Sequence, residues 1–563
     1  MDYSQLVETY KKLESTTKRL EKTTIISNLL RETKTEDLRM IVLLLQGKIF
    51  PAWDEREIGV ASRLVIKAIS LATGSSANEI EDKWKQTGDL GLVSEHFTTG
   101  KRQKTLFSQK LTVKKVFSNL QKLATLEGKG TVTKKIQLLA ELLTSASPDE
   151  AKYIVRTVLC ELRVGIGSGT MRDAIIEAFF DEKDKETVQI VQNAYDLTND
   201  FGEVAEIAKA KGINSLKNIP LTVGRPIKVM LYMKAKNISD GFERVGKPAA
   251  IEYKYDGFRI QLHGKNGSIK LFTRRLEDVT AQFPDIVKIV KGLIKADEFI
   301  LDGEVIGIDA KTKKWLPFQN ISQRIKRKYD IEKVAKEVPV MLNLFDAMQV
   351  KGENIINKPF RERRTMLKKI TEEQPNKLEL ARQIITSDEK KAEDFYKESL
   401  KKGNEGIMMK NLEAVYKPGS RVGYGVKVKP TMENLDVVIT GAEWGEGKRA
   451  NWLTSFTIAI IDDDKNLLEV GKVGTGIKEK EAGLTFEKLT GLLKPLIISE
   501  KGREVKVKPE IVIEVSYEEI QKSPTYSSGY ALRFPRVISL REDMSADDCS
   551  TLNVLEDLYQ NQR

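Results

Sequence analysis

The chain has 563 residues, too many for one hydrophobic core, and this length predicts roughly three to four domains. A formal net charge of +12 favours a polyanionic partner without proving one. Two cysteines and two histidines exclude a four-cysteine zinc site and argue against a disulfide framework. The aliphatic runs are too short to span a bilayer, and the start lacks the apolar core of a signal peptide. We therefore expect a cytoplasmic protein with no membrane partner.

The first 217 residues are predicted to be mostly helical. Leu6, Tyr10 and Leu13 recur at helical spacing with charged residues between them, and similar patterns follow along this part of the chain. The segment 218–231 brings two prolines and a glycine together, which indicates a linker into a second domain. No internal repeat is apparent.

From about residue 250 the hydrophobic period changes to two, which is typical of strands. A glycine-rich turn over 264–268 predicts a hairpin, and further strands alternate with helical patterns. These features predict a mixed α/β domain over 218–431. The last block, 432–563, is strand-rich with glycine-rich turns, and its spacing suits a small β-barrel.

The run 251–263 places Lys254 on an apolar strand, followed closely by Asp256 and Gly257. A lysine amine becomes a nucleophile when its surroundings, its neighbours or a metal suppress its charge. This short pattern also arises by chance, and a solvated lysine before a turn is the ordinary alternative. Other segments must therefore decide between the two interpretations.

A second candidate group is a pair of carboxylates, Asp302 and Glu304, on the predicted strand 298–308. Alternate residues of a strand share a face, and Asp and Glu are poor strand formers. Hard cations such as Mg²⁺ prefer oxygen ligands and accept one or two carboxylates together with substrate phosphates. The pair predicts a metal site, with an exposed strand face as the alternative.

Two further strands carry charged residues. Strict alternation puts Glu405 and Lys410 on opposite faces, so they need a bend between them or have different roles. Lys427 and Lys429 share a face and repel each other. A bound phosphate would relieve that repulsion, and so would exposure to solvent.

Aromatic and arginine residues complete the candidates. Phe345 ends an apolar strand, where it could stack on a purine ring or simply belong to the core. Arg533, Arg536 and Arg541 lie close together near the C-terminus, which suits a phosphate clamp or a solvated basic patch. The nearest approach to a Walker-type loop, over 441–449, has the wrong glycine spacing.

The ordered segments KYDG, FTRRLED, LDGEV, LNLFDAM, EGIMMK, GVKVKP and ALRFPR resemble the ATP-dependent DNA ligases, most closely the archaeal replicative type. The match runs in order over nearly the whole chain, which makes coincidence untenable. The resemblance implies a helical DNA-binding domain over 1–217, an adenylation (nucleotidyltransferase) domain over 218–431 and an oligonucleotide-binding (OB-fold) barrel over 432–563. It implies nicked double-stranded DNA as the substrate, in replication, repair and recombination. We expect a monomer.

The same resemblance implies a mechanism. Lys254 would attack the α-phosphate of ATP and form lysyl-AMP, AMP would pass to the 5′-phosphate of a nick, and the 3′-hydroxyl would then displace AMP. Glu252 and Phe345 would meet the adenine, and Arg259 the ribose. The ATP-binding set implied is Glu252, Arg259, Arg274, Glu304, Phe345, Lys410, Lys427, Lys429 and Arg533. The metal set implied is Asp302, Glu304 and Glu405, holding Mg²⁺ or alternatively Mn²⁺.

One segment departs from the family pattern. The family usually has Trp-Leu before the first lysine of the GVKVK segment, whereas this chain has Gly425 and Val426. Tyr424 would supply the lost aromatic ring one position earlier. The departure puts the local packing in doubt more than the lysines. The segment 432–436 is the expected hinge between the last two domains.

Three alternative interpretations compete with this one. An RNA ligase or an RNA-capping nucleotidyltransferase shares the lysine motif, but it does not explain the long helical region before that motif. The NAD-dependent DNA ligases carry a four-cysteine zinc site that two cysteines cannot build. A non-catalytic DNA-binding scaffold would have no need for the lysines and carboxylates together.

The residues Gln103, Leu106 and Phe107 resemble the short motif that binds the PCNA sliding clamp in related ligases. Two adjacent large apolar residues among polar ones fit an exposed anchor, and an ordinary buried loop is the alternative.

We predict that Phe107→Ala leaves nick sealing intact and removes stimulation by the clamp, because an anchor contributes to binding and not to chemistry. Sealing assays with and without the clamp, paired with a direct binding measurement, check this. Clamp binding by the variant equal to that of the parent would contradict it.

Overall fold

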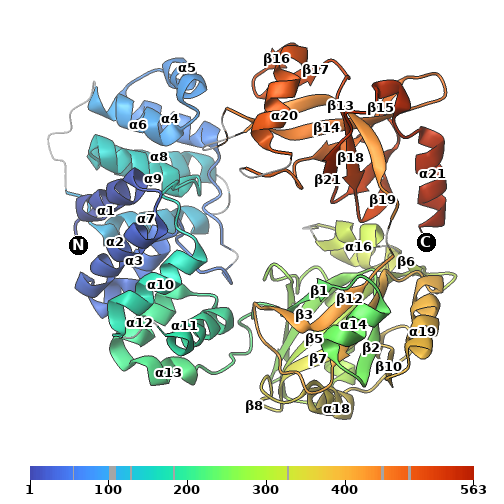
Figure 1. The fold of residues 1–563 in the computed structure, drawn as a ribbon. Coiled ribbons are helices and arrows are strands. Elements are labelled where there is room, and N and C mark those ends of the chain that lie inside the picture. The colour runs from blue at the N-terminus through green and yellow to red at the C-terminus, as the bar shows by residue number, and fades with distance from the viewer. Residues whose placement is uncertain are drawn as a thin grey trace. The chain divides into compact units, whose positions relative to one another are not determined.

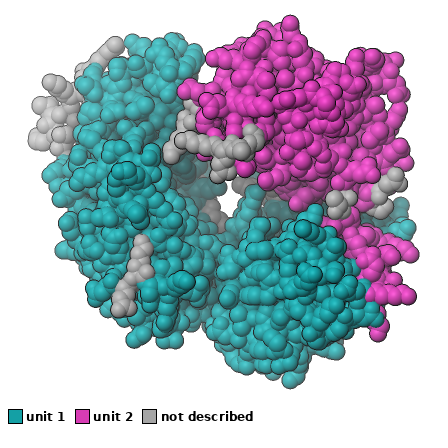
Figure 2. Space-filling model, in the orientation of Figure 1, with its two compact units in different colours: residues 1–389, 408–427 teal, residues 390–407, 428–563 magenta. Residues whose placement is uncertain are grey.

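The computed structural model describes the whole chain except residues 55, 101–109, 127, 129, 182–183, 317, 326, 328, 431, 446–448, 450, 480–483 and 563, and the side chains of 319 and 561. The predicted clamp motif falls within 101–109 and so lies outside the described residues. The chain forms two compact units, one of residues 1–389 with 408–427 and the other of residues 390–407 with 428–563 (Figure 2). The predicted domain boundaries at 217 and 431 stay predictions, because this division groups the first two domains together.

The N-terminal part is all helical, as the sequence predicts (Figure 1). The apolar stripe of the first helix is buried, with Leu6, Tyr10 and Leu13 at 0% exposure. Ser147 and Glu150 form a reciprocal capping box at the start of the ninth helix. The helices are α1 (Tyr3–Ser15), α2 (Arg19–Glu32), α3 (Thr35–Leu45), α4 (Ser62–Thr73), α5 (Ala77–Thr87), α6 (Leu90–Thr99), α7 (Val113–Thr125), α8 (Thr131–Ser145), α9 (Pro148–Val158), α10 (Ser168–Phe179), α11 (Lys185–Thr198), α12 (Phe201–Lys211) and α13 (Ile213–Lys217).

A structural unit occurs twice in this helical region, although the sequence predicts no repeat. Asp89 caps α6 and pairs with Arg156 on α9, while Asp200 caps α12 and pairs with Arg39 on α3. In both copies the glycine two residues after the aspartate lies against that arginine, so that a Cβ would come within 2.7 and 2.6 Å of its side chain. The shared signal is only Asp-x-Gly, which is too short to recognise in the sequence.

The central region contains two sheets, which the change of hydrophobic period predicts. In the first sheet the strand order is β1-β12-β11-β2-β10, and in the second it is β4-β3-β5-β7-β8, with β6 beside β5 and β9 beside β7. The strands are β1 (Leu231–Lys234), β2 (Ala249–Lys254), β3 (Phe258–Lys265), β4 (Ser268–Thr273), β5 (Glu298–Ile308), β6 (Trp315–Leu316), β7 (Val340–Val350), β8 (Glu353–Asn354), β9 (Leu378–Leu380), β10 (Gln383–Thr386), β11 (Gly406–Asn411) and β12 (Arg421–Val428). The helices are α14 (Ile238–Val245), α15 (Pro284–Leu293), α16 (Phe318–Ile325), α17 (Ile331–Glu337), α18 (Phe360–Ile370) and α19 (Glu389–Lys401).

The C-terminal region is built mostly from antiparallel strands around its own apolar core. Its main sheet has the order β15-β14-β13-β17-β16, with β18 joining β13 to β21, and β19 pairs separately with β20. The elements are β13 (Leu435–Trp444), β14 (Leu453–Ile461), β15 (Leu467–Val473), α20 (Phe486–Leu493), β16 (Ile497–Lys501), β17 (Glu504–Val507), β18 (Val512–Ser516), β19 (Glu519–Lys522), β20 (Tyr530–Arg533), β21 (Arg536–Leu540) and α21 (Leu552–Asn561). Among the described residues, none of the helices combines the length and the apolar character that crossing a bilayer demands.

Two polar side chains of β3 fasten the predicted linker 218–231 to the second sheet. Gln261 accepts a hydrogen bond from the Ile227 N–H at 2.8 Å and donates to the Ile227 carbonyl at 3.1 Å. The Gly224 N–H donates to His263 Nδ1 at 3.0 Å, and His263 Nε2 donates to the Gln261 side chain at 2.8 Å. The linker is therefore held by side chains and not only by its own turns.

The other side of the linker contacts the helical region. Arg225 forms an ion pair with Glu203 at 2.7 Å, and Asn199 Nδ2 donates to the Pro226 carbonyl at 2.8 Å. These contacts explain why the helical and central regions group into one compact unit.

We predict that His263 makes stability fall in acid. Burial, together with the charge of Lys270, lowers the pKa of His263 to about 3 from an ordinary 6.5, so the unfolded chain binds a proton that the folded chain does not. This contribution is complete above about pH 6.5 and declines by about 1.4 kcal/mol per pH unit on the way down towards pH 3.

Calorimetry of the full chain and of His263→Gln between pH 7 and pH 4 measures the difference. Glutamine can still accept from Gly224 and donate to Gln261, so the variant should show the shallower dependence on pH. Parallel curves for the two proteins would contradict this role for His263.

Candidate active site

Lys254 is the last residue of β2 and is half-buried. Gly257 lies against β5 so closely that a Cβ there would be 2.3 Å from the Val305 carbonyl oxygen and 3.0 Å from Glu304 Cγ. Only glycine allows this approach. The lysine motif and the strand of Glu304 therefore meet because the fourth residue of KYDG has no side chain.

Asp256 has a structural contact of its own. Its Oδ2 accepts a hydrogen bond from the Phe318 N–H at 3.4 Å, at the start of α16, and its side chain is buried. The carboxylate thus helps to begin the helix that follows β6.

Glu252 is buried on β2 between two donors from neighbouring strands. Lys410 Nζ on β11 lies 2.6 Å from Glu252 Oε2, and Gln383 Nε2 on β10 donates to Oε1 at 2.8 Å. The Lys410 ammonium also lies 4.9 Å from the centre of the Phe345 ring. The structure brings these predicted residues together, and it adds Gln383, which sequence reasoning missed.

Part-buried Arg259 and fully buried Asp302 form a second ion pair. Arg259 Nε and Nη2 donate to the two oxygens of Asp302 at 2.9 and 2.5 Å, and Arg259 Nη1 donates to the Met230 carbonyl at 2.6 Å. The Tyr416 hydroxyl donates to Asp302 Oδ2 at 2.9 Å. Burial by itself would lower the pKa of Arg259, but the Asp302 carboxylate holds that pKa above its ordinary value.

These contacts differ from those that the predicted metal role of Asp302 requires. Its side chain is fully buried, and both oxygens accept hydrogen bonds from Arg259 or Tyr416. The geometry is that of a counter-ion for Arg259. Glu304, on the same strand, is only half-buried.

A β-bulge places Phe345 in this layer of charges. Across β5 and β7, Gly303 faces Leu344 and Asp302 faces Asp346, so Phe345 is the extra residue between them. The Arg259 guanidinium lies 5.4 Å from the centre of its ring. Phe345 therefore contacts cations, which a purely apolar core position would not predict.

Asp346 forms a third buried ion pair, with Arg363 on α18, at 2.8 Å. Burial alone would raise the pKa of Asp346, but the Arg363 guanidinium outweighs it, and that pKa lies below its ordinary value. Lys410 adds to the same effect. The Arg363–Asp346 pair therefore also interacts with the Lys410 of the first pair.

Gly425, where the sequence departs from the family pattern, packs against a side chain from another strand. A Cβ on Gly425 would come within 2.5 Å of the Tyr232 ring on β1. The Tyr424 hydroxyl donates to the Val415 carbonyl at 3.1 Å. The aromatic ring that packs against this position is therefore that of Tyr232, in addition to the predicted Tyr424.

The other compact unit holds Glu405 and Lys429. A Cβ on Gly406 would be 2.1 Å from the Val428 carbonyl oxygen, so the segments that carry these two residues run side by side. Lys429 pairs with Glu405 and, at 3.2 Å, with Glu518. Burial would lower the pKa of Lys429, but the Glu405 carboxylate and then Glu518 raise it. Lys427 lies on β12 and is half-buried.

Two of the three arginines of the predicted phosphate clamp already form ion pairs within their own compact unit. Arg533 pairs with Glu519 at 2.9 Å, and Arg541 pairs with Asp436 at 2.7 Å. Arg536 is exposed, as is Arg274 in the turn after β4. Binding of a phosphate by Arg533 would therefore compete with an existing ion pair.

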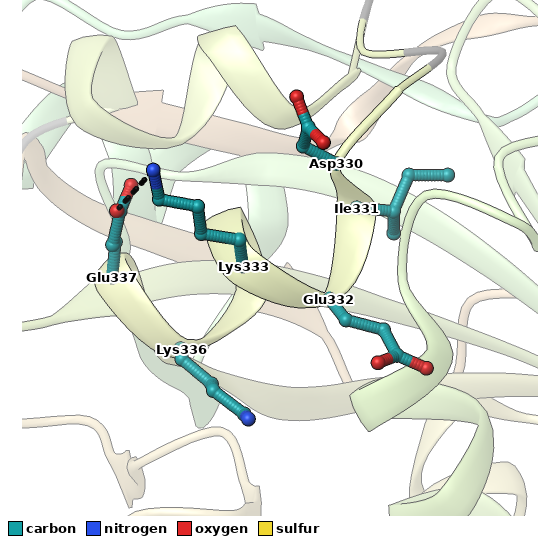
Figure 3. Close-up of a pocket in the computed structure, with 6 residues that line it drawn as sticks. All are labelled: Asp330, Ile331, Glu332, Lys333, Lys336 and Glu337. Atoms are coloured by element: carbon teal, nitrogen blue, oxygen red, sulfur yellow. Dashed lines mark ion pairs between the residues drawn. The ribbon is translucent and has the colours of Figure 1, made fainter.

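A pocket of about 760 Å³ lies on the surface of α17 (Figure 3). Two of the charged residues that line it pair with each other, since Lys333 Nζ lies 4.0 Å from Glu337 Oε1. None of the candidate site residues lines it.

Three family models match the chain in the same order as its helical, mixed and strand-rich regions. The model described as "DNA ligase N terminus" matches residues 2–176, "ATP dependent DNA ligase domain" matches residues 229–429, and "ATP dependent DNA ligase C terminal region" matches residues 449–544. A DNA ligase of Nanoarchaeum equitans (strain Kin4-M) is 50% identical over 567 residues, which cover 100% of this chain and 99% of that protein. The chain belongs to the ATP-dependent DNA ligase family.

Other relatives extend the comparison. A DNA ligase of Thermococcus onnurineus (strain NA1) is 44% identical over 100% of this chain and 98% of its own length. A solved structure named "Pmar-Lig_Pre." shares the fold, with a TM-score of 0.58, 17% identity and coverage of 95% of this chain and 99% of that one. The enzyme is thus an ATP-dependent DNA ligase, which seals nicks in DNA, and an RNA ligase or capping enzyme is not favoured.

Several residues of the site carry no sequence signal that could have found them. Tyr416 and Arg363 come from outside the motifs, and Gln383 lies on a short edge strand. Tyr232 fills the space above a glycine far away in the chain. They come from a helix, a loop and two strands, and only the fold brings them together.

We predict opposite effects for two neighbouring substitutions on β5. Asp302→Asn should destabilise the enzyme by about 3 kcal/mol, since it removes the buried charge that pairs with part-buried Arg259. It should leave unchanged the Mg²⁺ concentration that half-saturates reaction with ATP.

Glu304→Gln is the matched control. It should keep its stability and raise that Mg²⁺ concentration about tenfold. Thermal melts and Mg²⁺ titrations of both variants check the pair. A higher half-saturating Mg²⁺ concentration in Asp302→Asn, without one in Glu304→Gln, would restore the metal role of Asp302.

Proposed function

We propose that the ligase reacts first with ATP through Lys254. The amine attacks the α-phosphate, the bond to pyrophosphate breaks, and a lysyl-AMP phosphoramidate forms. AMP then passes to the 5′-phosphate of a nick in duplex DNA, and the 3′-hydroxyl attacks that phosphate and releases AMP. The observation that carries this proposal is the position of Lys254, which ends a strand beside Glu304 because Gly257 permits the close approach.

Around the nucleotide, Glu252 and Phe345 meet the adenine and Arg259 meets the ribose. The fixed ion pairs of Glu252 and Arg259 support these roles, because they hold both side chains in place before ATP arrives. Lys427 and Lys429 hold the α-phosphate, and Arg274 and Arg533 meet other phosphates. Lys429 and Arg533 are paired with carboxylates, so ATP must replace part of those contacts.

Glu304 and Glu405 would hold Mg²⁺, or Mn²⁺ in its place, together with phosphates of ATP. Among the described residues no group of three or more His, Cys, Asp or Glu side chains could hold a metal by itself. That fits Mg²⁺, which usually binds one or two carboxylates plus substrate phosphates. When bound, the ion neutralises the charge that develops on the phosphates.

The remaining parts handle DNA and partners. The helical region 1–217 grips duplex DNA, and the strand-rich region 432–563 is an OB-fold barrel that turns about the hinge 432–436. The basic net charge supports a nucleic-acid partner. We further propose that the ligase acts as a monomer in the cytoplasm, in DNA replication, repair and recombination, and binds PCNA through Gln103, Leu106 and Phe107.

We predict that Lys254→Ala abolishes covalent labelling by ATP labelled on the α-phosphate. A denaturing gel should show acid-labile label on the parent protein that requires a divalent metal, and a loss of a thousandfold or more, on the order expected for a missing nucleophile, in the variant.

Lys265→Ala is the matched control, because Lys265 is an exposed lysine paired only at the surface with Glu298. It should label like the parent. Label retained by Lys254→Ala would falsify the assignment of the nucleophile.

A further inference from the structure

We propose that Gln383 is a positioning residue that sets the preference of this ligase for adenine. Together with Lys410, it fixes the orientation of the Glu252 carboxylate, which accepts a hydrogen bond from the amino group of the base. The inference rests on the proposed function, in which Glu252 meets the adenine, and it adds a residue that lies outside every motif of the sequence.

The two donors reach Glu252 from opposite sides. Strand β2 lies between β11 and β10 in the first sheet, and Gln383 is the direct cross-strand partner of Glu252. Lys410 from β11 contacts Oε2 at 2.6 Å, and Gln383 from β10 donates to Oε1 at 2.8 Å. Each carboxylate oxygen thus has one partner, so the plane of the carboxylate cannot turn without breaking a contact.

Burial keeps solvent away from the contacts between Glu252 and Lys410. Glu252 is 2% exposed and Lys410 is 4% exposed, so water cannot replace either donor. The Lys410 ammonium is confined further by Phe345 and Phe360, whose ring centres lie 4.9 and 4.6 Å away. The aromatic rings fix the lysine, and the lysine and Gln383 fix the carboxylate.

The fixed anion discriminates between purines by hydrogen-bond polarity. An ionised carboxylate only accepts hydrogen bonds. The exocyclic amino group of adenine donates, whereas the oxygen at the same position of guanine accepts and is repelled. If Gln383 is removed, Glu252 loses the partner of one oxygen and gains freedom to turn away from the amino group.

The experiment compares the full-length enzyme with Gln383→Leu in formation of the covalent nucleotide. Three substrates are used: ATP, purine riboside triphosphate, which lacks the amino group, and GTP. For ATP, kcat/KM should fall about tenfold, mainly through KM, as expected for loss of a hydrogen bond to a buried charged group. For purine riboside triphosphate it should not change, because there is no amino group left to bind.

The ratio of GTP use to ATP use should rise about tenfold, since hydrogen-bond polarity is the source of discrimination. Gln189→Leu is the matched control, because Gln189 is an exposed glutamine that donates to Asn193 at 2.7 Å on α11. It should behave like the parent with all three nucleotides.

Two outcomes would overturn the proposal. Equal losses for ATP and purine riboside triphosphate would mean that Gln383 only supports the fold, and unchanged kinetics with ATP would mean that it does not position Glu252. Failure of the proposed function looks different, because the parent enzyme itself would then form no covalent nucleotide.

Discussion

The candidate site depends on three ion pairs buried in the central region: Lys410 with Glu252, Arg259 with Asp302, and Arg363 with Asp346. A single buried charge without a partner would be strongly destabilising, so each member constrains the position of the other. Such pairs add little stability compared with apolar residues of the same size. Their effect here is geometrical, because they fix donors and acceptors before a nucleotide binds.

Close approaches of the backbone also shape each compact unit by itself. Gly257 allows the segment after Lys254 to lie against β5, and Gly406 allows the segment after Glu405 to lie against Val428. Gly425 admits the Tyr232 ring. At all three positions an added Cβ would overlap neighbouring atoms, so the glycines of the motifs are explained by packing as well as by chain flexibility.

The cations that we propose to meet phosphates in the other unit are held differently. Lys429 and Arg533 are already paired with carboxylates of the same unit. These pairs hold the two cations, yet they leave them able to exchange one anionic partner for another, because the Arg533 and Glu518 side chains are not fully buried. The groups proposed to meet the nucleobase are therefore held by buried contacts, whereas the cations proposed to meet phosphates can exchange partners.

The sequence alone determined the order of helical, mixed and strand-rich regions, because hydrophobic periodicity is a local property. It also determined the candidates Lys254, Glu304 and Phe345, because their motifs are contiguous. It showed neither the partners of Asp302 nor the repeat in the helical region. Pairing of Asp302 with Arg259 and Tyr416, of Glu252 with Gln383, and of Gly425 with Tyr232 was decided only by the tertiary structure. The reason is physical: strand order and β-bulges set which distant side chains meet, and neither leaves a periodic signal in the chain.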